Sequence, residues 1–331
     1  MPGRFSYPLT RSTKPRRLSP RSGWRSLVRR LNNLFPFTKQ GAHSARPVSP
    51  IPWRDALWVL PFFFFIFLLV FLPSASLLSG SFQDKRGNFT LQNYLDLFKP
   101  SILSAYWISI RISLASALGG GLLGFMMAYG ITVGGLPRRL RTALLTFSGV
   151  ASNFAGVPLA FAFMATLGRT GLITVLIQTL FGINLYERGF SIYSFWGLTF
   201  TYIYFQFPLM ILIITPALDG LRREWREAAQ ILGASSWEYW RRVALPVLTP
   251  SILGAMILLF GNAFGAYATA LSLTGGVINL VTTLIGAQIK GDVLQNLGLG
   301  YALAMGMVVV MAIMISIYYL LRRYSERWLK I

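Results

Sequence analysis

The sequence predicts an all-α integral membrane protein with about six transmembrane helices and both termini in the cytoplasm. Of its 331 residues, 54% are hydrophobic and only 12% are charged, which is about half the charged share of an ordinary soluble domain. Six apolar stretches are each long enough to cross a bilayer. Each stretch should be a helix, because a backbone in lipid must satisfy its own hydrogen bonds. The basic residues between the stretches gather on one side of the membrane.

Residues 1–54 form a basic, polar region ahead of the first apolar stretch. The region contains no acid, and it is too long and too polar for a cleaved secretory signal. We therefore expect a cytoplasmic tail that is mostly disordered, with His43 solvated. Residues 24–35 carry apolar side chains near helical spacing, with arginines between them. This stretch fits an interfacial helix on anionic lipid, and a solvated basic linker fits it equally well.

The remaining chain divides into a first span with its outer loop, residues 55–99, and a core of five spans, residues 100–331. The spans are expected at 55–72, 104–131, 143–167, 192–217, 249–273 and 297–321. Two shorter apolar runs, 172–186 and 277–289, have the length of re-entrant or interfacial pieces. Counting either run alone as a span would move later basic loops outside, against the positive-inside rule. Six spans keep most of the 31 Lys and Arg residues inside.

Two pairs of glycines four residues apart lie within the expected spans. They are Gly120 with Gly124 and Gly261 with Gly265. Small residues at this spacing share one helix face and let two helix backbones approach closely. We expect helix–helix contacts at both pairs.

The composition excludes several kinds of site. The chain has no cysteine, so thiolate metal sites and cysteine nucleophiles are excluded. It has no glycine-rich phosphate loop with Lys and Ser/Thr, so it does not bind ATP by that route. None of its ten acids lies deep in a span, which argues against an ion-coupled carrier and against a membrane enzyme with paired carboxylates. The net charge of +21 is concentrated in the tail and the inside loops, which excludes nucleic acid as the expected partner.

Five polar side chains are candidates for lining a transport pathway. They are Arg111, Asn153, Gln206, Asn262 and Tyr267. An amide or hydroxyl in an apolar span must find a partner, and hydrogen bonds between helices explain such residues as well as solute contacts do. Arg111 is the one charge well inside a span. It either reaches out to the membrane interface or attracts an anion.

The inside loop between the fourth and fifth spans, residues 218–248, is longer than a helix connection requires. An apolar helical face runs from Leu221 to Leu232. Gly233 follows it, as glycine does just past the end of a helix. The loop therefore predicts a first short helix that ends at this glycine.

A second short helix is expected directly after the first. Ser235 and Glu238 have the spacing of a capping box, which starts a helix. We expect Pro246 to stop this helix, because proline cannot continue one, and Pro250 to begin the fifth span. The loop then has the form helix, glycine, helix, which is suited to fit into a partner protein.

The same loop carries a spaced motif. Its residues are Glu227, Ala228, Ala229, Gly233, Val243, Leu245 and Pro246. The pattern resembles the EAA motif of permease subunits of binding-protein-dependent ABC importers, with a valine at 243 where the family has isoleucine. The resemblance implies a type I ABC importer permease fold from about residue 100 onward.

The resemblance also implies partners. In the family these seven residues belong to a coupling helix that docks on a cytoplasmic ATPase dimer. A second permease subunit, identical or different, and an extracytoplasmic solute-binding protein are implied too, at the inner membrane of a bacterium. ATP and Mg²⁺ would be used by the ATPase, so this chain would bind no cofactor and would not be an enzyme.

The nature of the solute is indicated only by further resemblance. Residues 153–163 and 264–268 look most like the subgroup that serves polyamines, sulfate, ferric iron or phosphonates. A polyamine or another small charged solute is therefore expected. The alternative to a permease subunit is a stand-alone channel or an ion-coupled secondary transporter, which would work without nucleotide.

Overall fold

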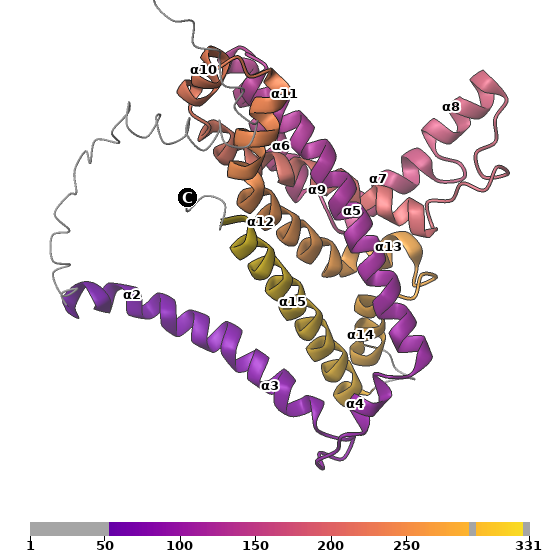
Figure 1. The fold of residues 1–331 in the computed structure, drawn as a ribbon. Helices are drawn as coiled ribbons and strands as arrows, with labels where there is room; N and C mark the ends of the chain where they lie inside the picture. The colour runs from indigo at the N-terminus through magenta and orange to yellow at the C-terminus, as the bar shows by residue number, and fades with distance from the viewer. Residues whose placement is uncertain (1–52, 291–295, 327–331) are drawn as a thin grey trace, which may run out of the picture. The chain divides into compact units, whose positions relative to one another are not determined.

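The computed structural model describes residues 53–290 and 296–326 (Figure 1). The chain falls into two compact units, Met1–Leu68 and Leu69–Ile331. The interfacial helix considered for residues 24–35 lies outside the described residues.

The described part of the first unit is helical. It contains α2, Trp53–Ile66, and the start of a π-helical segment, η1, Phe67–Phe71. The large apolar side chains from Trp58 to Leu68 are exposed, apart from Ile66, which is half-buried. Such a surface is stable only in a nonpolar environment, as expected for a helix in lipid.

The second unit contains the other helices. They are α3 (Leu72–Ser81), α4 (Gln92–Asp96), α5 (Pro100–Val133), α6 (Arg138–Asn153), α7 (Val157–Leu167), α8 (Leu172–Phe181), α9 (Phe195–Asp219), α10 (Arg223–Ile231), α11 (Ser236–Tyr239), the π-helix η2 (Trp240–Ala244), α12 (Leu245–Phe264), α13 (Tyr267–Thr274), α14 (Val281–Lys290) and α15 (Leu297–Glu326). Within this unit α10 and α11 lie at one end, and α4 and α14 lie at the other (Figure 1).

By length and composition, six segments of the described chain can cross a membrane, which confirms the predicted number. They are Trp58–Ser81, Pro100–Val133, Val157–Phe181, Phe195–Asp219, Ser236–Phe264 and Leu297–Arg323. The second, fourth and sixth agree closely with the expected spans. The other three differ, each for a local reason.

The first span continues past its expected end at residue 72. Pro73 lies in the first turn of α3, directly after η1, and a π-helical turn relieves the clash of a proline ring with the preceding turn. The hydroxyl of Ser74 donates to the carbonyl of Val70 (2.6 Å), so this polar residue is satisfied within the helix. The helix therefore extends to Ser81.

The third predicted span, 143–167, is wrong as a single helix. The chain turns between α6 and α7 at Gly156, which has a φ of +74°, and the hydroxyl of Thr269 accepts the N–H of this glycine (2.8 Å). Pro158 then lies in the first turn of α7, where its missing N–H costs nothing. By length and composition the third candidate span is Val157–Phe181. It includes α8, which the sequence analysis assigned to an interfacial piece.

The fifth predicted span, 249–273, and the stop at Pro246 are also wrong. The helix is continuous over Ser236–Phe264, because η2 lies immediately before Pro246 and its wider turn accommodates the ring. The chain then breaks at Gly265 before α13 begins. The second short helix of the inside loop thus runs directly into the membrane.

The parallel pair α5 and α9 forms the centre of the second unit. A Cβ added at Gly120 would lie 2.6 Å from the Cβ of Gln206, and one added at Gly124 would lie 2.6 Å from the Cβ of Met210. These distances are too short for any real Cβ, so both positions require glycine. The close approach predicted for this pair of glycines is confirmed.

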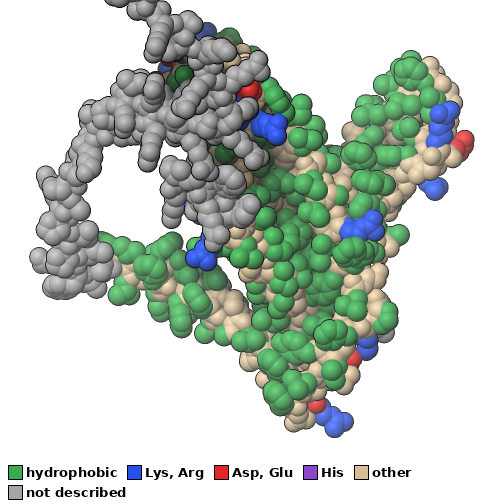
Figure 2. All heavy atoms as spheres, viewed as in Figure 1, with side chains coloured by type: hydrophobic (Ala, Val, Ile, Leu, Met, Phe, Trp, Pro, Cys, Tyr) green, Lys and Arg blue, Asp and Glu red, His purple; other side chains and the backbone are tan. Residues whose placement is uncertain are grey.

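In the second pair, Gly261 and Gly265, only one glycine lies at a helix–helix contact. A Cβ at Gly261 would lie 2.8 Å from the Cε of Met311 on α15, whereas a Cβ at Gly265 would meet only its own helix. Helix contact is therefore confirmed at Gly261 and wrong at Gly265. α12 packs against α5 and α9, and α15 packs against α12, α14 and α3. Figure 2 shows hydrophobic side chains covering much of the visible face of α5, α12 and α15.

Candidate functional site

α10 ends in a Schellman motif, which closes the first half of the inside loop. The N–H of Gly233 donates to the carbonyl of Gln230 (2.9 Å), and the N–H of Ala234 donates to the carbonyl of Ala229 (2.9 Å). Gly233 has a φ of +77°, in the left-handed region that glycine adopts without steric cost. The predicted end of the helix at this residue is confirmed.

α11 begins with the predicted capping box. The hydroxyl of Ser235 accepts the N–H of Glu238 (3.2 Å), and the carboxylate of Glu238 accepts the N–H of Ser235 (3.0 Å). Two backbone donors that the helix itself leaves unpaired are satisfied in this way. The bend between α10 and α11 is thus fixed on both sides of Gly233 by specific hydrogen bonds.

Removal of the cap should loosen α11. We expect Ser235→Ala to destabilise the start of this helix by about 1 kcal/mol and to raise amide hydrogen exchange at residues 236–240 about fivefold. Ser235→Asp keeps an acceptor at the same place and serves as the control. Equal protection in the wild type and in Ser235→Ala would contradict the role of the cap.

The bend exposes large apolar side chains. Ile231 is 86% exposed, Trp237 is 69% exposed and Leu232 is 44% exposed. We call these three residues the bend face. Outside the membrane, clustered apolar side chains of this size mark a surface that binds another protein.

The seven residues of the EAA-like motif lie along this bent element. Glu227 and Gly233 are exposed, Ala228 and Ala229 are half-buried on α10, Val243 is half-buried in η2, Leu245 is exposed, and Pro246 is half-buried in the first turn of α12. The motif therefore has residues on α10, at the glycine after it, in η2 and at the start of α12, and none in α11. Two of its exposed residues, Glu227 and Gly233, lie within six residues of Ile231 and Leu232 of the bend face.

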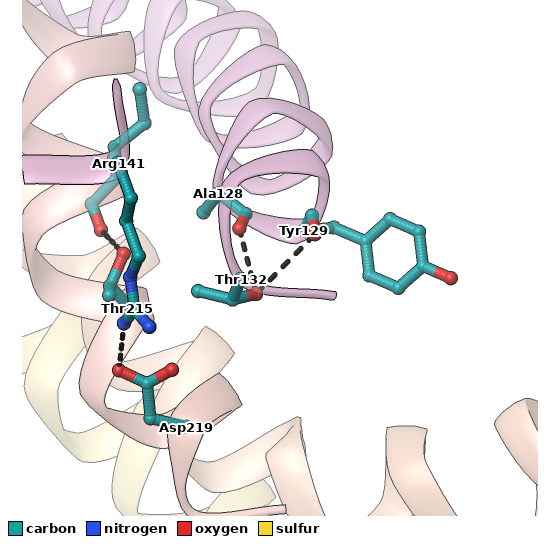
Figure 3. Close-up of polar contacts among 7 residues, drawn as sticks. Ala128, Tyr129, Thr132, Arg141, Thr215 and Asp219 are labelled. Atoms are coloured by element: carbon teal, nitrogen blue, oxygen red, sulfur yellow. Dashed lines mark hydrogen bonds and ion pairs between the residues drawn. The ribbon is translucent and has the colours of Figure 1, made fainter. Parts of the chain in front are cut away.

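An ion pair ties the base of the loop to the helix bundle. Arg141 in the first turn of α6 lies 2.5 Å from Asp219 at the end of α9, and Figure 3 shows the two side chains directed toward each other. Both line a cleft of about 750 Å³ that also borders α10 and Trp240. The two side chains are partly exposed, so the pair contributes at most about 1 kcal/mol. It joins the first turn of α6 to the end of α9, where the loop begins.

The five expected pathway residues are dispersed, and among the described residues no hydrogen bond joins any two of them. The guanidinium of Arg111 lies over the ring of Phe195, 5.2 Å from its centre. The amide of Asn153 donates to the carbonyl of Gly149 in its own helix (2.8 Å). The first contact joins α5 to α9 and the second stays within α6, and neither gives a direct sign of a pathway.

Gln206 is a link between helices. It is fully buried between α5 and α9, and its amide donates to the hydroxyl of Ser116 (2.7 Å). Asn262 is exposed on α12. The ring of Tyr267 on α13 lies beside the ammonium of Lys290, 5.7 Å from the ring centre.

Two of the long-range polar links that sequence reasoning missed bear on the loop and on the helix bundle. One is the pair of Arg141 and Asp219, which lie 78 residues apart. The other is Ser109, whose buried hydroxyl accepts the N–H of Val281 at the start of α14 (3.0 Å). The sequence signal for the second was a run of serines on one face of α5, because Ser113 and Ser116 are buried too.

The chain matches a family model and several curated proteins. The family described as "Binding-protein-dependent transport system inner membrane component" matches residues 120–330. The spermidine/putrescine transport system permease protein PotB of Haemophilus influenzae is 27% identical over 275 residues, 80% of this chain and 93% of that protein. The sulfate transport system permease protein CysT of Salmonella typhimurium is 24% identical over 217 residues, 64% of this chain and 72% of that protein.

A third relative and two solved structures are also similar. The thiamine transport system permease protein ThiP of Escherichia coli is 30% identical over 175 residues, 52% of this chain and 32% of that protein. A bacterial ABC transporter involved in the import of alginate has a chain that superposes with a TM-score of 0.67 at 16% identity, over 82% of this chain and 96% of that one. A second structure of a bacterial alginate ABC transporter, bound to its periplasmic protein, gives a TM-score of 0.64, also at 16% identity, over 83% and 96%.

At this level of identity the structures establish the fold alone, and it is that of an ABC importer permease. The family model covers well over half of the chain, including the bend, the motif and the membrane helices that follow them. The chain is therefore a multi-pass membrane protein that belongs to the binding-protein-dependent transport system inner membrane components, the permease subunits of ABC importers.

Proposed function

We propose that this permease imports a small charged solute across a bacterial inner membrane, driven by an ATPase that docks on residues 218–248. The observation that carries the proposal is the bend face, with Ile231 86% exposed and Trp237 69% exposed beside the EAA-like motif. Apolar anchors of this kind supply much of the binding energy of protein interfaces. Glu227 adds an exposed charge for an opposite partner.

The helix after the bend is suited to transmit the movement of the ATPase. It is continuous over Ser236–Phe264, so a displacement of α11 moves α12 with it as one rigid element. We propose that ATP and Mg²⁺ are bound and hydrolysed by a separate ATPase dimer, and that this chain binds neither. A second permease subunit, identical or different, completes the pathway, and an extracytoplasmic binding protein delivers the solute.

The proposed solute class rests on the relatives. Their names specify spermidine and putrescine, sulfate, and thiamine, which are all small and charged, though not of one sign. A polyamine is our first candidate, because the polyamine permease matches the largest share of the chain among these three. Arg111, Asn153, Gln206, Asn262 and Tyr267 are the residues proposed to line or support the pathway.

Reconstitution tests the proposal directly. The permease with its ATPase, its second permease and its binding protein is placed in sealed vesicles, and uptake of labelled putrescine, sulfate and thiamine is measured. We expect uptake of one of them that requires ATP on the ATPase side and the binding protein on the other side. Uptake by the permease alone, without nucleotide, would instead establish a channel or an ion-coupled carrier and would refute the proposal.

A further inference from the structure

A groove lies between the cytoplasmic halves of α12 and α15. It has a volume of about 530 Å³ and is lined by residues of these two helices and by Ile213 of α9. α12 enters the membrane from the cytoplasmic loop, and α15 ends near the C-terminus, so both helices have their cytoplasmic ends here. The groove is thus at the depth of the inner leaflet.

The groove is polar at its cytoplasmic end and apolar elsewhere. Ser251, Tyr318 and Arg322 line it, and Arg322 lies in the last part of α15. The other lining residues are apolar side chains, proline and glycine. A membrane helix places a basic residue at this depth so that its charged group reaches the headgroups.

The absence of a side chain at Gly254 keeps the groove open. A Cβ added there would lie 3.4 Å from the hydroxyl of Tyr318, so a methyl group is tolerated and a large side chain would fill the space. A second pocket of about 130 Å³, between the same two helices and α5, shares Ile257 and Tyr318 with the groove and continues further into the membrane to Phe260. Apart from Tyr318 its lining is apolar. Polar and apolar surface therefore follow one another along the membrane normal.

We propose that this groove binds one anionic phospholipid of the cytoplasmic leaflet. Its phosphate lies at Arg322 and Ser251, and one acyl chain follows α12 past Gly254 toward Phe260. The order of charge, hydroxyls and apolar surface matches the order of headgroup and chain in a lipid. Basic pockets between membrane helices on the cytoplasmic side bind anionic headgroups by the same physics. The groove shares no lining residue with the bend face or with the five proposed pathway residues, and its occupant bridges α15 to the helix that continues from α11.

Native mass spectrometry of the full importer complex tests the site. The complex is extracted from nanodiscs that contain either phosphatidylglycerol or phosphatidylcholine, and the retained lipid is counted. Arg322→Gln should lower retention of phosphatidylglycerol about fivefold. The matched control is Arg323→Gln, which removes the same charge from an exposed neighbour that does not line the groove, and it should retain the lipid as the wild type does.

A second variant tests the apolar part without changing charge. Gly254→Phe should expel the lipid, whereas Gly254→Ala should keep it. Equal loss in Arg322→Gln and Arg323→Gln would show general attraction to charge and would overturn the proposal, as would equal retention of the two lipids. Cross-linking of Gly254→Cys to another membrane subunit would show that protein covers the groove, and would overturn the proposal too.

Discussion

Gly233→Val is expected to abolish ATP-driven uptake, whereas Gly233→Asn should keep most of it. The φ of Gly233 is +77°, and a left-handed conformation costs a β-branched residue about 1–3 kcal/mol. Asparagine adopts this region far more readily. The strained bend should open, so that α10 and α11 no longer present the bend face as one surface.

The test separates backbone strain from crowding. A Cβ at position 233 would meet no atom within 4 Å, so both variants fit in space and differ only in backbone preference. Uptake is measured together with the amount of permease in the membrane, which should be the same for both. Full uptake by Gly233→Val would contradict the role assigned to the bend.

Gly124→Leu should prevent α5 and α9 from packing and should lower the stability of the folded bundle by about 3 kcal/mol. A Cβ there would lie 2.6 Å from the Cβ of Met210, and it would also meet the backbone carbonyl of Phe207. A backbone cannot move aside as a flexible side chain can. The expected result is a large drop in thermal unfolding temperature in detergent, with little functional protein in the membrane.

The same helix offers a matched control. Gly130 also lies on α5, but a Cβ at this position would meet nothing within 4 Å. Gly130→Leu should therefore unfold within a few degrees of the wild type. Equal destabilisation by the two variants would mean that leucine disturbs α5 itself, and the close contact with α9 would lose its support.

Local signals in the sequence predicted the bend well. The capping box of Ser235 and Glu238 and the helix end at Gly233 depend on hydrogen bonds between near neighbours, so their spacing is visible in the chain. The contact at Gly120 and Gly124 was also predictable, because a pair of small residues on one face has few other uses in an apolar helix.

Other features depend on long-range contacts or on unusual turns. The hydropathy is continuous through Gly156, so the span was predicted as one helix. Pro158, two residues later, indicated at most a kink there, whereas the chain breaks between α6 and α7. Pro246 is normally a reason to end a helix, and only the π-helical turn before it lets the helix continue. The ion pair of Arg141 and Asp219 joins residues 78 positions apart, and a single sequence does not show which of many charges will meet.

The pathway residues were the least predictable part of the site. Gln206 was a reasonable candidate because it is polar in an apolar span, yet its amide bonds to Ser116 within the α5–α9 contact. A hydrogen bond between helices and a contact with the solute would both offset the free-energy cost of burying this amide. The sequence shows that a polar side chain lies in an apolar span, but it does not show which group forms the hydrogen bond.

The docking of the bend on an ATPase is tested most directly by labelling one thiol. The chain has no cysteine, so Ile231→Cys carries a single reactive group on the bend face. In sealed right-side-out vesicles an impermeant maleimide should leave it unlabelled, and in inside-out vesicles it should react until the ATPase is added and covers it. Labelling from the outer side, or labelling that the ATPase leaves unchanged, would contradict the account.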